Sequence, residues 1–279
     1  MLAAYRRALE PYREVFLTGP DMGTFPADFA GELDGPPPLW AQSYEGVDMD
    51  DLATGHGVKA AAEAALAHGG RALNGAAIAI EGFGKVGAGM ALASARAGAR
   101  IVGVSTVDGL LADPDGLDVD ELFSLRERFG DALVAHGPAP VRPREELFDL
   151  ECDVLVPGAR PDSITRDVAA RLRCAVVAPG ANVPYGPGAV EELHRRGIIA
   201  VPDFIANAGG IHLYTSVAQD GSAPEALARI EELIREGVAR TLDAADRHGI
   251  TPLAAALLAG REFLAESGAA DDLLDELFA

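Results

Sequence analysis

The chain of 279 residues is 49% hydrophobic, which is enough to bury a sizeable core in one large domain or two smaller ones. Its 43 acidic and 23 basic residues give a net charge of −20, which repels phosphate backbones and anionic membranes, so we expect no nucleic acid partner. The N-terminus lacks the apolar core of a signal peptide and no stretch reaches about 18 uncharged apolar residues, so we expect a cytoplasmic protein without a membrane partner.

The spacing of apolar residues predicts an alternation of strands and helices. Within the first fifty residues, Gly35–Pro38 is too rich in proline for regular structure, and an alanine-rich helix follows over 51–68. Apolar runs rich in β-branched residues predict buried parallel strands at 76–80, 100–105, 153–156, 175–178 and 198–201. Helical patterns over 87–97, 118–129, 164–172 and 188–195 separate these strands. The predicted fold is therefore α/β, a Rossmann-like doubly wound parallel sheet flanked by helices.

The C-terminal part is predicted to be helical. Ser222 and Glu225 have the spacing of a capping box and open a helix that continues to about His248. Thr251 followed by Pro252 is typical of the start of another helix, and a last helix is predicted over 271–278.

Cysteine and lysine are both scarce. Cys152 and Cys174 each stand at the start of an apolar run, where a thiol usually behaves as a small buried hydrophobe. The chain has no further cysteine and no histidine pair at ligand spacing, so we expect neither a metal site nor a disulfide. Lys59 and Lys85 are the only lysines, so a mechanism that needs an amine has two candidates.

A glycine-rich motif of the form G-x-G-x-x-G joins the first predicted strand of the sheet to the next helix. It consists of Gly82, Phe83, Gly84, Lys85, Val86 and Gly87. In this context the first glycine permits a tight turn, the second lets the backbone approach a pyrophosphate, and the third lets helix and strand pack closely. The motif favours a dinucleotide site, and the alternative is a glycine-rich turn without a ligand.

The choice of dinucleotide depends on the end of the second strand of this unit. Asp108 lies 21 residues after Gly87, close to the position at which an acid binds the adenosine ribose of NAD. Alternatively, Asp108 only shapes the turn before Gly109, and Ser105 with Thr106 bind a 2′-phosphate. The expected cofactor is NAD or NADP, with NAD weakly favoured.

Several segments, taken in order, resemble the glutamate/leucine/phenylalanine/valine dehydrogenase family. They are Gly19–Thr24 (GPDMGT), Ala53–Val58 (ATGHGV), Glu81–Gly87 (EGFGKVG), Cys152–Pro157 (CDVLVP), Gly180–Asn182 (GAN) and Pro202–Gly210 (PDFIANAGG). The resemblance implies an oxidoreductase that transfers a hydride from the α-carbon of an amino acid to nicotinamide and hydrolyses the imine to a keto acid.

The resemblance also implies roles for individual residues. Asp21 matches the aspartate that shuttles protons, and its alternative reading is a turn former before Gly23. Thr54 matches the position that binds the nicotinamide carboxamide, and Asn182 and Asn207 match positions near the nicotinamide ribose and the substrate. Each of these three is otherwise a helix cap or turn former. Ala159 matches a backbone position near the cofactor.

The sequence departs from the family pattern at the catalytic lysine. In the family this lysine precedes the segment that matches GPDMGT, but none of the twenty residues before Asp21 is a lysine. Two further departures are the acidic run Asp48–Asp51, where the family has an arginine, and Tyr214, where glutamate-specific members place a serine. Glutamate is therefore a doubtful substrate.

These observations lead to one predicted function and one alternative. We expect an NAD(P)-dependent amino-acid dehydrogenase in which a second polypeptide supplies the lysine, within a homo- or hetero-oligomer. The alternative is a non-catalytic NAD(P)-binding regulatory or structural subunit. The predicted domains are a remnant of a substrate domain at 1–50, a dinucleotide-binding domain at 51–220, and C-terminal helices at 221–279 that pack back on the first layer.

Overall fold

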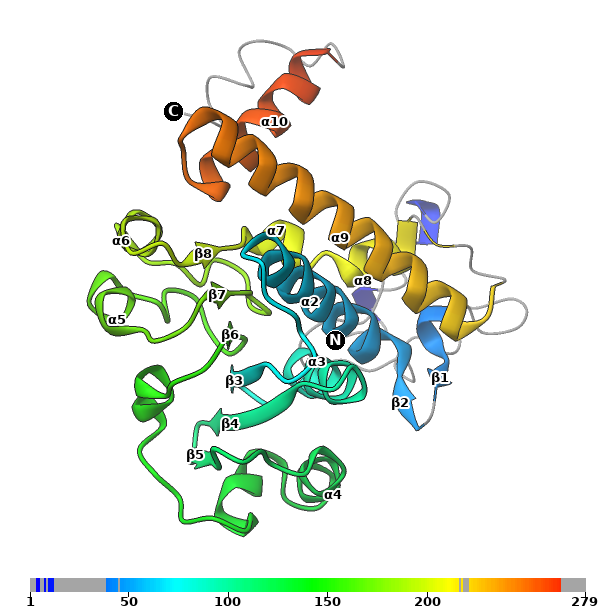
Figure 1. Cartoon of the computed structure of the whole chain (residues 1–279). Coiled ribbons are helices and arrows are strands. Elements are labelled where there is room, and N and C mark those ends of the chain that lie inside the picture. Colours follow the sequence, from blue (N-terminus) through cyan, green and yellow to red (C-terminus); the bar gives the residue numbers. More distant parts are fainter. Residues whose placement is uncertain are drawn as a thin grey trace.

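The computed structural model describes residues 4–5, 8, 10–12, 39–44, 46–215, 217 and 221–266. Within these ranges the chain forms a six-stranded sheet of order β5-β4-β3-β6-β7-β8 with helices on both faces (Figure 1). All neighbouring strands in this sheet are parallel except β4 and β5, which are antiparallel. The predicted α/β class and parallel sheet are confirmed, and the helix predicted over 271–278 lies outside the described residues.

The strands and helices follow the predicted order with boundaries that shift by a few residues. The strands of the sheet are β3 (Ala77–Glu81), β4 (Arg100–Thr106), β5 (Gly109–Ala112), β6 (Val154–Pro157), β7 (Val176–Val177) and β8 (Ile199–Ala200). The main helices are α2 (Met49–His68), α3 (Lys85–Arg96), α4 (Val119–Phe129), α5 (Arg166–Arg171), α6 (Ala189–Arg195), α9 (Ala223–His248) and α10 (Pro252–Glu266).

Some short elements were not predicted from the sequence. They are the hairpin of β1 (Ser43–Tyr44) and β2 (Val47–Asp48), the edge strand β5, the short helices α7 (Asp203–Ala206) and α8 (Gly209–Thr215), and the 3₁₀ helices η3 (Leu39–Ala41), η4 (Gly130–His136) and η5 (Arg144–Asp149). All are seven residues or shorter, so they carry too few apolar residues to produce a readable period.

The sheet separates two apolar cores because successive side chains of a strand point to opposite faces. Ile78 and Ile80 of β3 belong to the larger core, which α2, α3, α4 and α9 cover. Ala79, between them, belongs to the smaller core under α5, α6 and η5. Burial on both faces explains why the strands are apolar throughout rather than alternating with polar residues.

Helix α2 lies at the centre of the larger core, where glycines bring its backbone against two other helices. A Cβ on Gly55 would lie 2.4 Å from the backbone of Gly89 in α3, and a Cβ on Gly89 would lie 2.4 Å from the carbonyl oxygen of Asp51. A Cβ on Gly209, at the start of α8, would lie 2.0 Å from the carbonyl oxygen of Ala53. Side chains at these positions are therefore excluded by backbone atoms, which cannot move aside.

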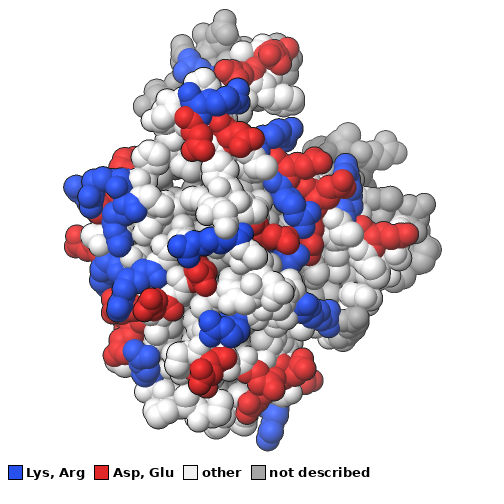
Figure 2. Space-filling view, viewed as in Figure 1, with Lys and Arg blue, Asp and Glu red and all other residues white. Residues whose placement is uncertain are grey.

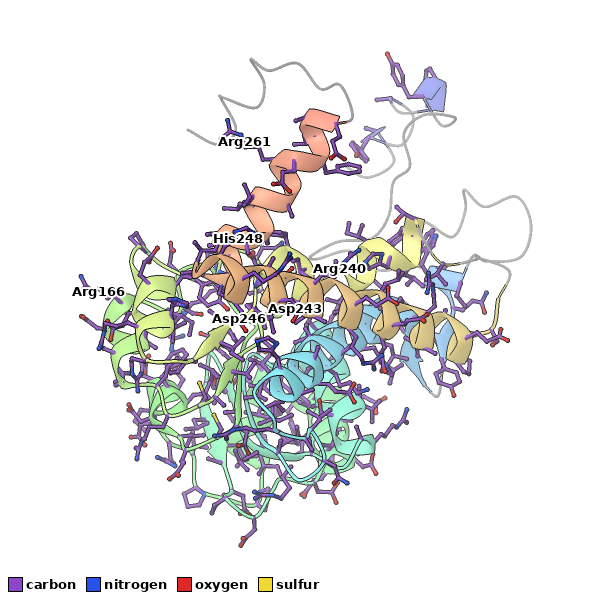
Figure 3. The ribbon with its side chains drawn as sticks, turned by 45° about the horizontal axis from the view of Figure 1, so that its top comes forward. Arg166, Arg240, Asp243, Asp246, His248 and Arg261 are labelled. Carbon is purple, nitrogen blue, oxygen red and sulfur yellow. The ribbon has the colours of Figure 1, made fainter. Side chains whose placement is uncertain are left out.

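Helix α9 packs along the other side of α2 (Figures 1 and 3). Its start has the predicted capping box, in which the Ser222 backbone N–H donates to Glu225 Oε2 at 3.1 Å. Near its end, Asp243 and Asp246 approach His68 at the end of α2, with 3.0 Å between His68 Nε2 and Asp246 Oδ2 (Figure 3).

The contact between α2 and α9 is centred on a half-buried carboxylate. Glu231 Oε1 lies 2.7 Å from His56 Nδ1, and Glu231 Oε2 accepts a hydrogen bond from Lys59 Nζ at 2.9 Å. On the same face, Arg235 of α9 donates to Glu63 of α2 at 2.9 Å. His56 and Lys59, one of only two lysines in the sequence, therefore join α2 to α9 through Glu231.

In the described part of the chain no helix is both long enough and apolar enough to cross a membrane.

The small elements η3 and β2 contact α2, and α9 contacts α2, α7 and α8. The division of the chain into domains at residues 50 and 220 stays a prediction.

We expect Glu231→Gln to destabilise the fold at neutral pH by about 2 kcal/mol, after discounting for partial exposure. Burial raises the pKa of Glu231, but the hydrogen bonds from His56 and Lys59 outweigh it, and the pKa lies at about 2, below its usual 4.5. Because the folded-state pKa is lowered, this stabilisation is present above pH 4.5 and is lost as the pH falls towards 2. Urea unfolding at pH 7 and in acid measures the difference. Glu232→Gln, at an exposed pair with Arg229, is the matched control, and an equal loss in both variants contradicts the prediction.

Candidate functional site

The glycine-rich motif forms the turn from β3 to α3. Gly82 has φ +87°, a conformation that favours glycine, and its N–H donates to the carbonyl oxygen of Ser105 at 2.8 Å. A Cβ on Gly87 would lie 2.0 Å from the Gly82 carbonyl oxygen, so this position admits only glycine. Gly84 is different, because a Cβ there would have no atom within 4 Å. The first and last glycines are therefore required by the fold, whereas Gly84 leaves open space outside the turn.

Helix α3 begins directly behind this open space. Its N-cap is Gly84, which has no side chain to accept a hydrogen bond from the first turn. The N-terminus of a helix carries unpaired N–H groups and a partial positive charge, and it attracts anions. A negatively charged group in the open space beside Gly84 would therefore face the unpaired N–H groups of the first turn of α3.

A cleft of about 330 Å³ adjoins the turn, at the carboxyl ends of β3, β4 and β6. Six of the residues expected from the sequence line it, namely Gly82, Phe83, Gly84, Ser105, Thr106 and Ala159. A larger cleft of about 750 Å³ lies at the opposite, amino ends of the strands. Ligands of open α/β sheets bind outside the carboxyl ends of the strands, so its position favours the smaller cleft as the ligand site.

Phe83 contributes its backbone rather than its ring to this cleft. The side chain is only 2% exposed, and its ring packs edge-on against Phe123 of α4 with centroids 5.9 Å apart. Val86 touches the neighbouring loop, since a Cβ on Gly180 would lie 3.0 Å from the Val86 side chain. Both residues position the turn within the core.

Asp108 and Thr106 lie at the end of β4, where the chain turns back into β5. Thr106 pairs with Gly109, which leaves Val107 and Asp108 as the two turn residues. The Thr106 hydroxyl donates to the carbonyl oxygen of Asp131 at 2.7 Å and accepts from the Asp108 N–H at 3.2 Å. Thr106 lines the cleft, whereas Asp108 is exposed in the turn beside it and is not among the lining residues. The local geometry is therefore compatible with both interpretations of Asp108, as a turn residue and as a residue at the rim of the cleft.

Charged residues that the sequence reasoning missed stand on the wall of the cleft. Glu81 ends β3, is 6% exposed, and accepts a hydrogen bond from Arg160 Nε on Oε1 at 3.3 Å. Its Oε2 is buried with no hydrogen-bond partner in the described structure. Arg144 and Glu145 face the cleft from η5. The position of Glu81 immediately before the glycine motif was the available signal, but a strand-end carboxylate is not part of that motif.

Asn182, Asn207 and Thr54 come from three elements. Asn207 Nδ2, at the end of α7, donates to Asn182 Oδ1 at 2.7 Å, so these two side chains meet. Thr54 lies in α2 next to the start of α8, where a Cβ on Gly210 would lie 3.1 Å from Thr54 Oγ1. Asp21 lies outside the described residues.

The acidic start of α2, which departs from the family pattern, lies against Lys85 of the glycine turn. Lys85 Nζ donates to Asp50 Oδ2 at 3.3 Å and lies 3.8 Å from Asp51 Oδ1. Arg126 of α4 donates to Asp51 Oδ2 at 3.4 Å. The positive charge of Lys85 in the glycine turn and the negative charges at the start of α2 thus compensate each other. The sequence did not predict this pairing.

Asp51 is the buried member of this charged cluster, and Asp50 links the cluster to the aromatic rings of Tyr214 and Trp40. Asp51 is 7% exposed, and burial raises its pKa while the charges of Arg126 and Lys85 oppose the increase. Asp50 Oδ1 accepts from the Tyr214 hydroxyl at 3.5 Å, and the Tyr214 ring lies 5.5 Å from Trp40, centroid to centroid. Tyr214 is thus tied to the start of α2.

Comparison with known proteins identifies relatives. The model of the Glutamate/Leucine/Phenylalanine/Valine dehydrogenase family matches residues 46–270. The NAD-specific glutamate dehydrogenase of Staphylococcus aureus (strain COL) is 38% identical over 161 residues, which are 58% of this chain and 38% of the relative. Glutamate dehydrogenase A2 of Halobacterium salinarum is 35% identical over 221 residues, which are 74% of this chain and 51% of the relative.

A solved structure shows the same similarity. The hetero-hexameric glutamate dehydrogenase from Thermus thermophilus, in its Leu-bound form, superposes with a TM-score of 0.65 at 32% identity. The match covers 76% of this chain and 51% of that one. The chain therefore spans about half the length of the relatives it matches, or less.

We expect Arg126→Met to destabilise the protein at pH 7 by about 2 kcal/mol, because it leaves Asp51 buried with less compensation. The folded-state pKa of Asp51 is already raised above its usual 3.8, so its ionisation weakens the fold as the pH rises through that raised pKa. Arg126→Met raises the pKa further, so the loss of stability grows with pH. In an Asp51→Asn background the same substitution should cost much less. Urea unfolding of the four proteins measures this, and an equal loss in both backgrounds would rule out the charge effect.

Proposed function

Because the chain belongs to the Glutamate/Leucine/Phenylalanine/Valine dehydrogenase family, we propose that it is the dinucleotide-binding part of an NAD(P)-dependent amino-acid dehydrogenase. The observation that carries the proposal is the open space at Gly84 in front of the uncapped α3, at the carboxyl edge of a parallel sheet. The relatives include an enzyme named as NAD-specific, which favours NAD over NADP.

The residues of the cleft fit such a cofactor. The backbone of Gly82–Gly87 and the start of α3 would hold the pyrophosphate by N–H groups and the helix dipole. Glu81 lines the cleft with its carboxylate held by Arg160, at the end of β3 just before the turn. Thr106 and the rim residue Asp108 would stand beside the adenosine ribose. When bound, NAD or NADP supplies the hydride acceptor for oxidation of the amino acid.

The nicotinamide end would lie where α2, α7 and the loop after β7 meet. Thr54, Asn182 and Asn207 would bind the carboxamide and the ribose there, and Ala159 would offer its backbone. Asp21 would shuttle protons at the substrate amine. These assignments follow from the family resemblance together with the Asn182–Asn207 hydrogen bond.

Neither lysine of the given sequence matches the water-activating lysine of the family. Lys59 is paired with Glu231 and Lys85 with Asp50, so each amine is held in an ion pair. We propose that a second polypeptide supplies this lysine within an oligomer. A general base of this kind typically contributes about 10²- to 10⁴-fold to the rate, so the chain alone should turn over slowly or not at all.

Purification at native expression level, followed by mass spectrometry of co-eluting proteins and an NADH assay with the twenty standard amino acids, tests this proposal. We expect NAD binding by the chain alone and amino-acid-dependent NADH formation once the partner is present. Binding without turnover under both conditions would favour the alternative, a non-catalytic NAD(P)-binding subunit. Absence of NAD and NADP binding would overturn both.

Gly84→Ala separates cofactor binding from folding. Because a Cβ at this position meets no protein atom within 4 Å, we expect its stability to stay within about 0.5 kcal/mol of wild type. The same Cβ would stand in the space of the pyrophosphate, so we expect the Kd for NAD to rise at least about tenfold in calorimetry. Gly260→Ala, also without a neighbour within 4 Å but on α10, is the control. Unchanged NAD affinity in Gly84→Ala would show that no phosphate lies there.

A further inference from the structure

The two cysteines of the chain are far apart in sequence but adjacent in the sheet. Glu151 pairs with Arg173 in a parallel bridge, and Val154 pairs with Val176, so Cys152 stands directly beside Cys174. The Cys152 N–H donates to the carbonyl oxygen of Arg173 at 3.1 Å, which fixes this register. Neighbouring strands lie roughly 4.8 Å apart, within the range of Cα separations that a disulfide can bridge.

Both thiols open to the same cleft. They pack against the smaller core from the same face of the sheet. Each is free and partly exposed, and both line the cleft of about 750 Å³ at the amino ends of the strands. A dithiol in an open cleft is accessible to a small reagent.

The walls of this cleft are rich in arginine although the chain as a whole is acidic. Four arginines line it, namely Arg71, Arg100, Arg173 and Arg196, against the two acids Glu151 and Asp153. Arg100, Arg173 and Arg196 each donate to main-chain carbonyl oxygens, which carry no net charge. Figure 2 shows several basic side chains, with acidic ones among them, on the side of the molecule that holds α5 and α6. The local field therefore favours an anionic reagent.

We propose that Cys152 and Cys174 form a redox-active dithiol that is oxidised to a disulfide by anionic low-molecular-weight disulfides entering the arginine-lined cleft. In cytosolic proteins, disulfides are usually transient and redox-sensing rather than structural. The site is separate from the proposed cofactor cleft, which lies at the other edge of the sheet.

The exchange takes two steps. The sulfur of one cysteine, as its thiolate, attacks one sulfur of the reagent, forms a mixed disulfide and releases the first thiol. The other cysteine then gives up its proton, attacks the sulfur of the first cysteine and releases the second thiol. Overall the protein loses two thiol protons and two electrons, and the reagent gains both as two thiols.

The test is thiol–disulfide exchange on the full chain with oxidised glutathione, followed by alkylation of remaining thiols and mass spectrometry of tryptic peptides. We expect a cross-link between peptides 145–166 and 174–195, which reduced glutathione reverses. Alkylation of both cysteines at every ratio of oxidised to reduced glutathione would overturn the proposal without any variant.

Two substitutions test the two-step exchange. Cys152→Ser and Cys174→Ser should each stop at a mixed disulfide with glutathione on the cysteine that remains, because no second thiol is present to displace the glutathione. Absence of a mixed disulfide in both folded variants would overturn the proposed exchange. Thermal unfolding of each variant shows whether it is folded.

A neutral reagent isolates the role of the arginines. We expect Arg100→Gln to slow reaction with oxidised glutathione by about fivefold and to leave reaction with the neutral bis(2-hydroxyethyl) disulfide unchanged. Arg166→Gln is the control, since Arg166 lies at the outer edge of the molecule and is not among the residues that line the cleft (Figure 3). An equal effect of Arg100→Gln on both reagents would show that charge does not direct the reaction.

Discussion

The close approach of three helices through glycine positions the glycine turn, Thr54 and the segment after Asn207 relative to one another. Helix α2 touches α3 at Gly55 and Gly89 and touches α8 at Gly209, in each case backbone against backbone. Because α3 carries the glycine turn and α8 follows Asn207, α2 sets the distance between the two halves of the cofactor site. Thr54 stands in α2 between these contacts, so its place depends on them. Packing of this kind tolerates almost no added volume.

The sequence predicted the fold well where its signals were long. Strands β3, β4, β6, β7 and β8 and the helices α3 to α6 follow from apolar runs and from the glycine motif, because burial on both faces leaves a continuous apolar pattern. The edge strand β5 escaped prediction because its four residues are too few to produce a readable pattern. Asp108 serves both interpretations that the sequence offers, since it is a turn residue of the hairpin and lies beside the cleft.

The site was less predictable than the fold because its details are pairings between distant residues. Asp50 belongs to the acidic run that departs from the family pattern, and the structure shows that Lys85 of the glycine turn is its partner. Cys152 and Cys174 had no predicted relation to each other, and the register of β6 with β7 makes them neighbours. Glu81 begins a family-like segment, but nothing in that segment predicts a role for its carboxylate. A single sequence contains the residues of such pairs but does not show that they are in contact.

The contrast between Gly84 and Gly87 also separates two kinds of evolutionary constraint. Gly87 is held by its own fold, since a Cβ there meets the Gly82 carbonyl oxygen, so any descendant that keeps this turn keeps that glycine. A Cβ on Gly84 would meet no atom of the described residues within 4 Å, so the fold does not require glycine there, whereas a molecule bound beside the turn would. Among related chains, retention of both glycines would mark lineages in which the cleft is still used. Replacement of the middle glycine alone would mark lineages that kept the scaffold after its ligand was abandoned.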